Sequence, residues 1–216
     1  MAEKIAKTYI VYDFIYITAG IPGVIFFRPK NVYASPEAKE RIKGGAIVTA
    51  NHSGLFDPIY LMMSIRYRRH HFVCLDSFFE GRFRGWLFSQ FHCIPINREN
   101  FSMAQLKRIT GELDQGRMVT MFPEGHVSGG QLSPFKSGVI LMALRSGKPI
   151  VPVYTLPRKH WYSRLVTFIG EKYSVVDDIG QRPAMGKIDE AARKLEARER
   201  ALQEMAAKYV ARREKH

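Results

Sequence analysis

Short apolar runs rich in β-branched residues alternate with amphipathic segments of helical spacing along most of this chain. Residues 46–50 (AIVTA) are the clearest strand, because a buried strand is a continuous apolar run bounded by turn residues, here glycines and Asn51. Asp57 followed by Pro58 is typical of a helix start, with the acid as N-cap and proline in the first turn. This alternation favours an α/β fold around a mixed sheet.

The same patterns predict the other elements. Further strands are expected at residues 71–75, 93–96, 118–122, 149–154 and 165–169. Helices are expected at residues 57–65, 84–91, 102–115, 134–146 and 187–215. Because 216 residues is close to the usual size of one domain, we predict a single domain over residues 31–216, its mixed central sheet flanked by helices and a long charged helix at its end.

Residues 9–27 are the longest apolar stretch, nineteen residues with a single charge, Asp13. A straight helix of this length reaches about 28 Å, which is marginal for crossing the hydrocarbon core of a bilayer. A buried acid is costly there, and the glycines and proline around Pro22 are a natural break. We therefore expect residues 1–30 to be a membrane-associating helical hairpin hinged near Pro22. A buried hairpin of a soluble protein is the alternative.

The chain is strongly basic, with 33 lysines and arginines against 20 aspartates and glutamates, a formal charge of +13. Its partner is therefore expected to be anionic: a membrane surface, a phosphorylated small molecule or nucleic acid. The standard nucleic-acid-binding signatures are missing from the sequence, which disfavours the last. Two cysteines, Cys74 and Cys93, exclude a disulfide framework and fit a reducing compartment. The predicted location is the cytoplasmic face of the cell membrane, as a monotopic or peripheral protein.

Polar groups gather where predicted strands end. His52 follows the strand at 46–50, and Asp57 comes five residues later at a helix start. A tight turn at Gly54 would bring the carboxylate against one ring nitrogen and leave the other free to accept a proton from a hydroxyl. A purely structural histidine is compatible with the same spacing.

Two other segments are candidates for anion binding. The glycine-rich loop at residues 122–130 (FPEGHVSGG) can present backbone N–H groups to an anionic oxygen. Arg98 ends the segment IPINR, where a guanidinium can clamp a phosphate. An ordinary glycine loop and a surface arginine are the alternatives. The spacings required for a serine nucleophile elbow, a P-loop or a metal site are missing, so these chemistries are not indicated.

Four segments in order, NHSGLFD, PINR, FPEGHVS and VPVY, resemble the sequence blocks of the glycerolipid acyltransferases typified by bacterial 1-acylglycerol-3-phosphate acyltransferases. The resemblance implies transfer of a fatty acyl group from acyl-CoA or acyl carrier protein to the free hydroxyl of a lysophospholipid, most simply 1-acylglycerol-3-phosphate giving phosphatidic acid. It implies no cofactor and no acyl-enzyme. His52 would be the general base and Asp57 would orient it. The substrate-binding residues that the resemblance implies are Arg98, Glu124, Gly125, Asn51 and Ser128.

The chain departs from the family in the third block. The family usually has Thr and then Arg after the glycine, whereas this chain has His126 and Val127, so one expected phosphate contact is missing. Arg98 would hold the acceptor phosphate alone, Lys136 or Arg82 would substitute, or the acceptor carries another head group. A basic nucleic-acid-binding module and a catalytically inactive lipid-binding protein of the same fold remain the alternative functions.

Overall fold

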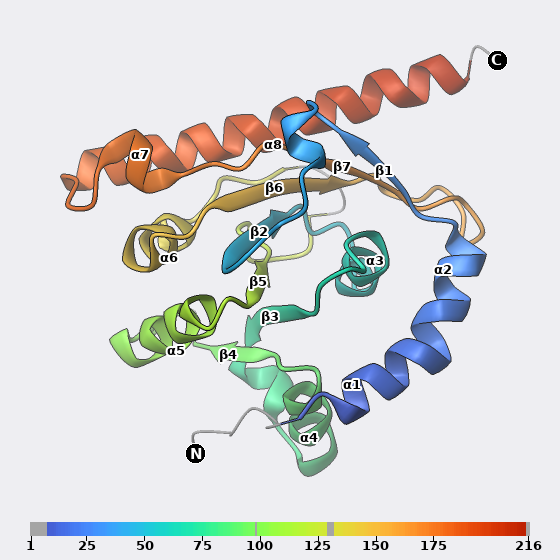
Figure 1. Cartoon of the computed structure of the whole chain (residues 1–216), viewed down its shortest axis with the longest axis horizontal. Helices are drawn as coiled ribbons and strands as arrows, with labels where there is room; N and C mark the ends of the chain where they lie inside the picture. Colours follow the sequence, from blue (N-terminus) through green and yellow to red (C-terminus); the bar gives the residue numbers. More distant parts are fainter. Residues whose placement is uncertain (1–7, 98, 129–131, 215–216) are drawn as a thin grey trace.

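A seven-stranded sheet forms the centre of the protein in the computed structural model, which describes residues 8–97, 99–128 and 132–214 (Figure 1). The strand order is β1-β7-β6-β2-β5-β3-β4. All neighbouring strands are parallel except β6 and β7, so the predicted mixed sheet is confirmed. The strands are β1 Lys30–Tyr33, β2 Ala46–Ala50, β3 His70–Leu75, β4 Ile94–Ile96, β5 Met118–Met121, β6 Ile150–Thr155 and β7 Val166–Ile169.

Helices cover both faces of this sheet. They are α1 Ile10–Ile15, α2 Ile21–Phe27, α3 Asp57–Ser64, α4 Arg82–Gln90, α5 Met103–Asp114, α6 Gly138–Ser146, α7 Val175–Ile179 and α8 Met185–Arg213, with short 3-10 turns at Glu37–Lys39 and Asp76–Phe79. One core lies between the sheet and α5, α6, α7 and α8, and a second lies between the sheet and α3 and α4. Every residue of β2 is buried, as expected for a central strand covered on both faces.

The predicted helix over residues 134–146 begins later, at Gly138. The backbone N–H groups before it have other partners: Ser133 donates to the Glu124 carboxylate (3.1 Å), and Lys136 donates to the Pro123 carbonyl (3.4 Å). These contacts hold residues 132–137 as a loop against the turn after β5.

The predicted hairpin hinged near Pro22 is wrong, because residues 10–27 form one continuous helical path along the side of the domain (Figure 1). A π-helical segment, Tyr16–Gly20, joins α1 to α2, and the Ile21 N–H donates five residues back to the Tyr16 carbonyl. Pro22 has no N–H group to donate one turn back. The wider π-helical turn before it accommodates the missing hydrogen bond, so the helix does not break there. Ile10–Phe27 is long and apolar enough to cross a membrane by length and composition, and only 6% of it is buried in the protein.

The connections after β2 and β5 leave the sheet on opposite faces. β2 leads into α3, which packs on one core, whereas β5 leads through a loop into α6, which packs on the other. β2 and β5 are neighbours and parallel, so their carboxyl ends form a topological switch point. In open α/β sheets ligands bind in the crevice at such a point.

Candidate active site

His52 and Asp57 meet at this switch point. The His52 Nδ1 lies 3.0 Å from the Asp57 Oδ2, and the same oxygen accepts hydrogen bonds from the backbone N–H groups of Ser53 (2.5 Å) and Gly54 (2.8 Å). Asp57 is the first residue of α3 and only 4% exposed. Because a carboxylate only accepts, it makes Nδ1 the protonated nitrogen and leaves Nε2 with a free lone pair.

The loop after β5 forms hydrogen bonds with both the backbone N–H and the backbone carbonyl of His52. The His52 N–H donates to the Glu124 Oε1 (3.1 Å), and the His52 carbonyl accepts from the N–H (2.7 Å) and hydroxyl (3.2 Å) of Ser128. The Phe122 ring stacks on the imidazole with centroids 4.2 Å apart. Glu124 is 2% exposed and its second oxygen accepts from the Ser133 N–H. In this structure Glu124 and Ser128 therefore support the histidine, and their polar atoms do not line the cavity described below.

Asn51 joins the ends of two strands. Its Oδ1 accepts from the Thr155 N–H (2.7 Å), and its Nδ2 donates to the Thr155 carbonyl (3.1 Å) and the Ser53 hydroxyl (2.9 Å). Asn51 is 1% exposed, so its amide fixes β2 against β6. Of the other predicted substrate-binding residues, Gly125 has a φ of +75°, a left-handed conformation that favours glycine, and it lines the cavity. Arg98 lies outside the described residues.

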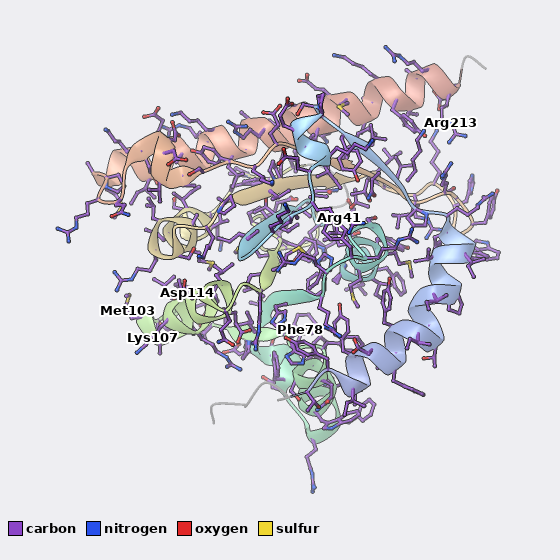
Figure 2. The ribbon with its side chains drawn as sticks, viewed as in Figure 1. Arg41, Phe78, Met103, Lys107, Asp114 and Arg213 are labelled. Atoms are coloured by element: carbon purple, nitrogen blue, oxygen red, sulfur yellow. The ribbon has the colours of Figure 1, made fainter. Side chains whose placement is uncertain are left out.

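A cavity of about 650 Å³ opens beside His52. Most of its wall is apolar, and it runs between α3, α4, α6 and the ends of β3, β4 and β5. Phe78, labelled in Figure 2, lines it and packs on Phe88 of α4 with ring centroids 5.5 Å apart. Among the described residues that line it, Lys136 is the only lysine or arginine.

Sequence reasoning missed this cavity. The aromatic segment 78–91 was an available signal, from which only the helix at 84–91 was predicted. The structure divides it: Phe88 and Phe91 face the cavity, whereas Phe83 and Trp86 are 70% and 49% exposed.

The fold and site define an α/β protein with a histidine–carboxylate pair at the switch point of its sheet, beside an apolar cavity. The Acyltransferase family model matches residues 28–156, more than half of the chain, so the protein belongs to this family.

Named relatives share part of the chain. The 1-acyl-sn-glycerol-3-phosphate acyltransferase of Bacillus subtilis is 28% identical over 108 residues, 50% of this chain and 54% of that protein. The chloroplastic 1-acyl-sn-glycerol-3-phosphate acyltransferase BAT2 of Brassica napus is 31% identical over 110 residues, 50% of this chain and 31% of that protein. The chain thus spans about half or less of these relatives' length.

The fold is also shared with a solved structure. The crystal structure of the 1-acyl-sn-glycerophosphate acyltransferase PlsC of Thermotoga maritima is similar with a TM-score of 0.60. The match covers 92% of this chain and 93% of that chain at 17% identity, a level at which the shared feature is the fold.

Proposed function

We propose that this protein is an acyltransferase that moves a fatty acyl group from acyl-CoA or acyl carrier protein to the free hydroxyl of a lysophospholipid. The proposed acceptor is 1-acylglycerol-3-phosphate and the product phosphatidic acid. One observation carries the proposal: the imidazole of His52, whose Nδ1 is held by Asp57, lines an apolar cavity. The family membership and the names of the relatives support the reaction class and the acceptor.

The chemistry follows from the order of proton and bond changes. His52 Nε2 takes the proton of the acceptor hydroxyl as its oxygen attacks the thioester carbonyl. The Asp57 carboxylate, 3.0 Å from Nδ1, stabilises the imidazolium that forms. When the tetrahedral intermediate collapses, the carbon–sulfur bond breaks and the proton passes from the imidazolium to the leaving thiolate. The step needs no acyl-enzyme and no cofactor.

We assign the cavity to the acyl chain of the donor. Its walls are apolar side chains from both faces of the sheet, among them Phe72 and Phe91 on one face and Val139 and Met142 on the other. Each methylene buried there contributes about 0.8 kcal/mol. A long saturated chain therefore gains enough to hold its thioester at the cavity mouth beside His52.

Lys136 is the proposed contact for the acceptor phosphate. It lines the cavity close to the loop where Val127 stands in the position of the family's arginine. Arg82, the other substitute considered from the sequence, does not line the cavity. Arg98 remains a predicted second contact.

A membrane surface fits the apolar exterior around this site. Leu55 and Phe56, in the turn between His52 and Asp57, are 79% and 62% exposed. Ring contacts continue from Phe56 to Tyr60 (6.4 Å) and from Tyr60 to Phe27 at the end of α2 (5.8 Å). We therefore propose that the N-terminal helix and the turn at the active site lie on the same anionic membrane, at its cytoplasmic face, so that a lysolipid reaches His52 from the bilayer.

In the test, the purified full chain is incubated with a labelled acyl donor, either acyl-CoA or acylated acyl carrier protein. A panel of lysolipids and glycerol 3-phosphate supplies the acceptors. We expect labelled phosphatidic acid from 1-acylglycerol-3-phosphate, and its loss in His52→Ala. His160→Ala is the matched control, because His160 is an exposed histidine stacked on Tyr162.

Other outcomes identify the alternatives. Vesicle binding with no product from any pair would favour an inactive lipid-binding protein. A shifted nucleic-acid probe with no vesicle binding would favour the nucleic-acid-binding module. Unchanged turnover in His52→Ala would remove the proposed mechanism.

A further inference from the structure

A second cavity, about 490 Å³, lies at the opposite ends of the parallel strands. It opens to solvent between the N-terminal helix and the residues that precede β3 and β5. The proposed acyl transfer uses none of its polar groups. These include Tyr16 and Asp13 from the helix and four arginines: Arg66, Arg68, Arg69 and Arg117.

Two of the four arginines have a carboxylate partner. Arg69 holds Asp13 through two hydrogen bonds, of 2.9 and 2.7 Å. Arg117 makes an ion pair with Glu112, which also lies 3.0 Å from the His71 Nδ1. These two ion pairs neutralise the charges of Arg69 and Arg117. Among the described residues, Arg66 and Arg68 have no carboxylate partner.

Arg68 carries a half-buried guanidinium whose hydrogen-bond partners among the described residues are all neutral. It donates to the carbonyls of Ile42 (3.2 Å), Gly44 (2.5 Å) and Gly116 (2.5 Å). Burial lowers the pKa of its guanidinium, and no carboxylate among the described residues forms an ion pair with it. Within the described residues, Arg66 makes no hydrogen bond and no ion pair, and it is exposed at the cavity.

The cavity is held in shape by contacts between the helix and the domain. The Tyr9 ring stacks on His92 with centroids 3.9 Å apart, and its hydroxyl lies 3.1 Å from the His71 Nε2. The Arg69 guanidinium lies over the Tyr9 ring, 4.5 Å from its centroid. The hydroxyl of Tyr12 accepts from the His70 N–H (3.3 Å). The helix that forms one wall is therefore fixed on the domain at several points.

We propose that this cavity binds a phosphate-bearing anion through Arg66 and Arg68. Two guanidinium groups without a carboxylate partner, two residues apart in the sequence and lining one cavity, match the forked hydrogen bonding of phosphate oxygens. A phospholipid head group and a free phosphate compound are two sources of this chemistry. The wall helix exposes Ile10, Phe14 and Ile17, so a bilayer lying on it would bring lipid head groups within reach. The site is separate from His52 and does not depend on the proposed acyl transfer.

The test uses the full chain with vesicles of phosphatidylcholine alone or mixed with phosphatidylglycerol, in a flotation assay. We expect Arg66→Gln to weaken binding to the anionic vesicles roughly fivefold and to leave binding to neutral vesicles unchanged, since one basic residue at an anionic surface contributes about 1 kcal/mol. Arg193→Gln is the charge-matched control, because Arg193 is an exposed arginine of α8, on the other side of the sheet. Equal weakening by the two variants would overturn the proposal, because the effect would then be general charge.

A second arm identifies the source of the phosphate. If inorganic phosphate raises the Tm of the wild-type chain more than that of Arg66→Gln, a free phosphate compound is a ligand of the site. If only the anionic vesicles separate the two chains, the ligand is the lipid head group. If neither separates them, the proposal is wrong. Acyl transfer in neutral detergent micelles should be the same in both chains, and loss of turnover there would place Arg66 in the reaction site and overturn the assignment of a separate one.

Discussion

Replacing Asp57 by asparagine tests the histidine–carboxylate pair with the smallest change in shape. Asparagine keeps an oxygen that can accept from the Ser53 and Gly54 N–H groups, which hold the turn in the present structure. It removes the negative charge 3.0 Å from the His52 Nδ1. The variant therefore separates charge from geometry at a buried position.

The size of the effect follows from that distance. Two unit charges 3.0 Å apart attract by about 5 kcal/mol at an effective dielectric constant of about 20. This attraction exists only once the imidazole has taken a proton, so its loss raises the barrier of the chemical step. Because about 1.4 kcal/mol corresponds to a factor of ten, we expect kcat to fall by about 10³ to 10⁴ with little change in KM.

Single-turnover and steady-state acyl transfer from labelled acyl-CoA measure this directly, with thermal unfolding as the check on folding. Asp114→Asn is the matched control, because this substitution removes the same charge from an exposed aspartate at the end of α5 (Figure 2). If Asp57→Asn folds and turns over within tenfold of the wild-type rate, the carboxylate does not stabilise a cationic imidazole and the reasoning fails.

Two further predictions concern the cavity and the folded state. Met142→Phe adds bulk to the cavity wall and should lower kcat/KM for a long-chain donor roughly 15-fold relative to a short one, if the ring displaces two methylenes at about 0.8 kcal/mol each. Leu141→Phe, on the exposed side of α6, is the control and should leave this ratio unchanged. A competition assay between acyl-CoA donors of two chain lengths measures the ratio. Burial works to raise the pKa of Glu112, but its contacts with His71 and Arg117 outweigh burial and lower the pKa from 4.5 to about 2. The ionised carboxylate therefore contributes about 3 kcal/mol to the free energy of unfolding above pH 4.5, and this contribution is lost as the pH falls toward 2. The Tm difference between wild type and Glu112→Gln should therefore narrow from pH 6 to pH 3, and a constant difference over that range would contradict the assignment.

The central elements were predictable because their signals are local. The strand at 46–50 and the helix at 102–115 carry their apolar pattern, and the latter its capping box of Ser102 and Gln105, within one segment. β1 was not predicted, because Lys30–Tyr33 is a half-polar segment whose partner, β7, lies more than 130 residues away in the sequence. The N-terminal hairpin was predicted wrongly because the effect of Pro22 was judged on an α-helix alone, whereas a π-helical turn accommodates it.

The candidate site divides in the same way. The contact between His52 and Asp57 was predictable, since both groups lie in one turn. The structural contacts of Asn51 and Glu124 were not, because their partners, Thr155 and His52, are 104 and 72 residues away. A sequence identifies such residues as polar, but whether a side chain faces a cavity or a backbone depends on which strands become neighbours.

The alternation of side chains along β2 explains why Asn51 and His52, the two residues that follow it, have different roles. Ile47 packs on the core with α5 and α6, and Val48 and Ala50 pack on the core with α3. Continuing this period of two, Asn51 lies on the side of Ile47 and His52 on the side of α3, the helix that begins with Asp57. A slip of β2 by one residue would exchange the two, so that the imidazole would leave its carboxylate and the amide would leave β6. The buried Asn51 amide opposes such a slip, because its hydrogen bonds with Thr155 can form in one register only.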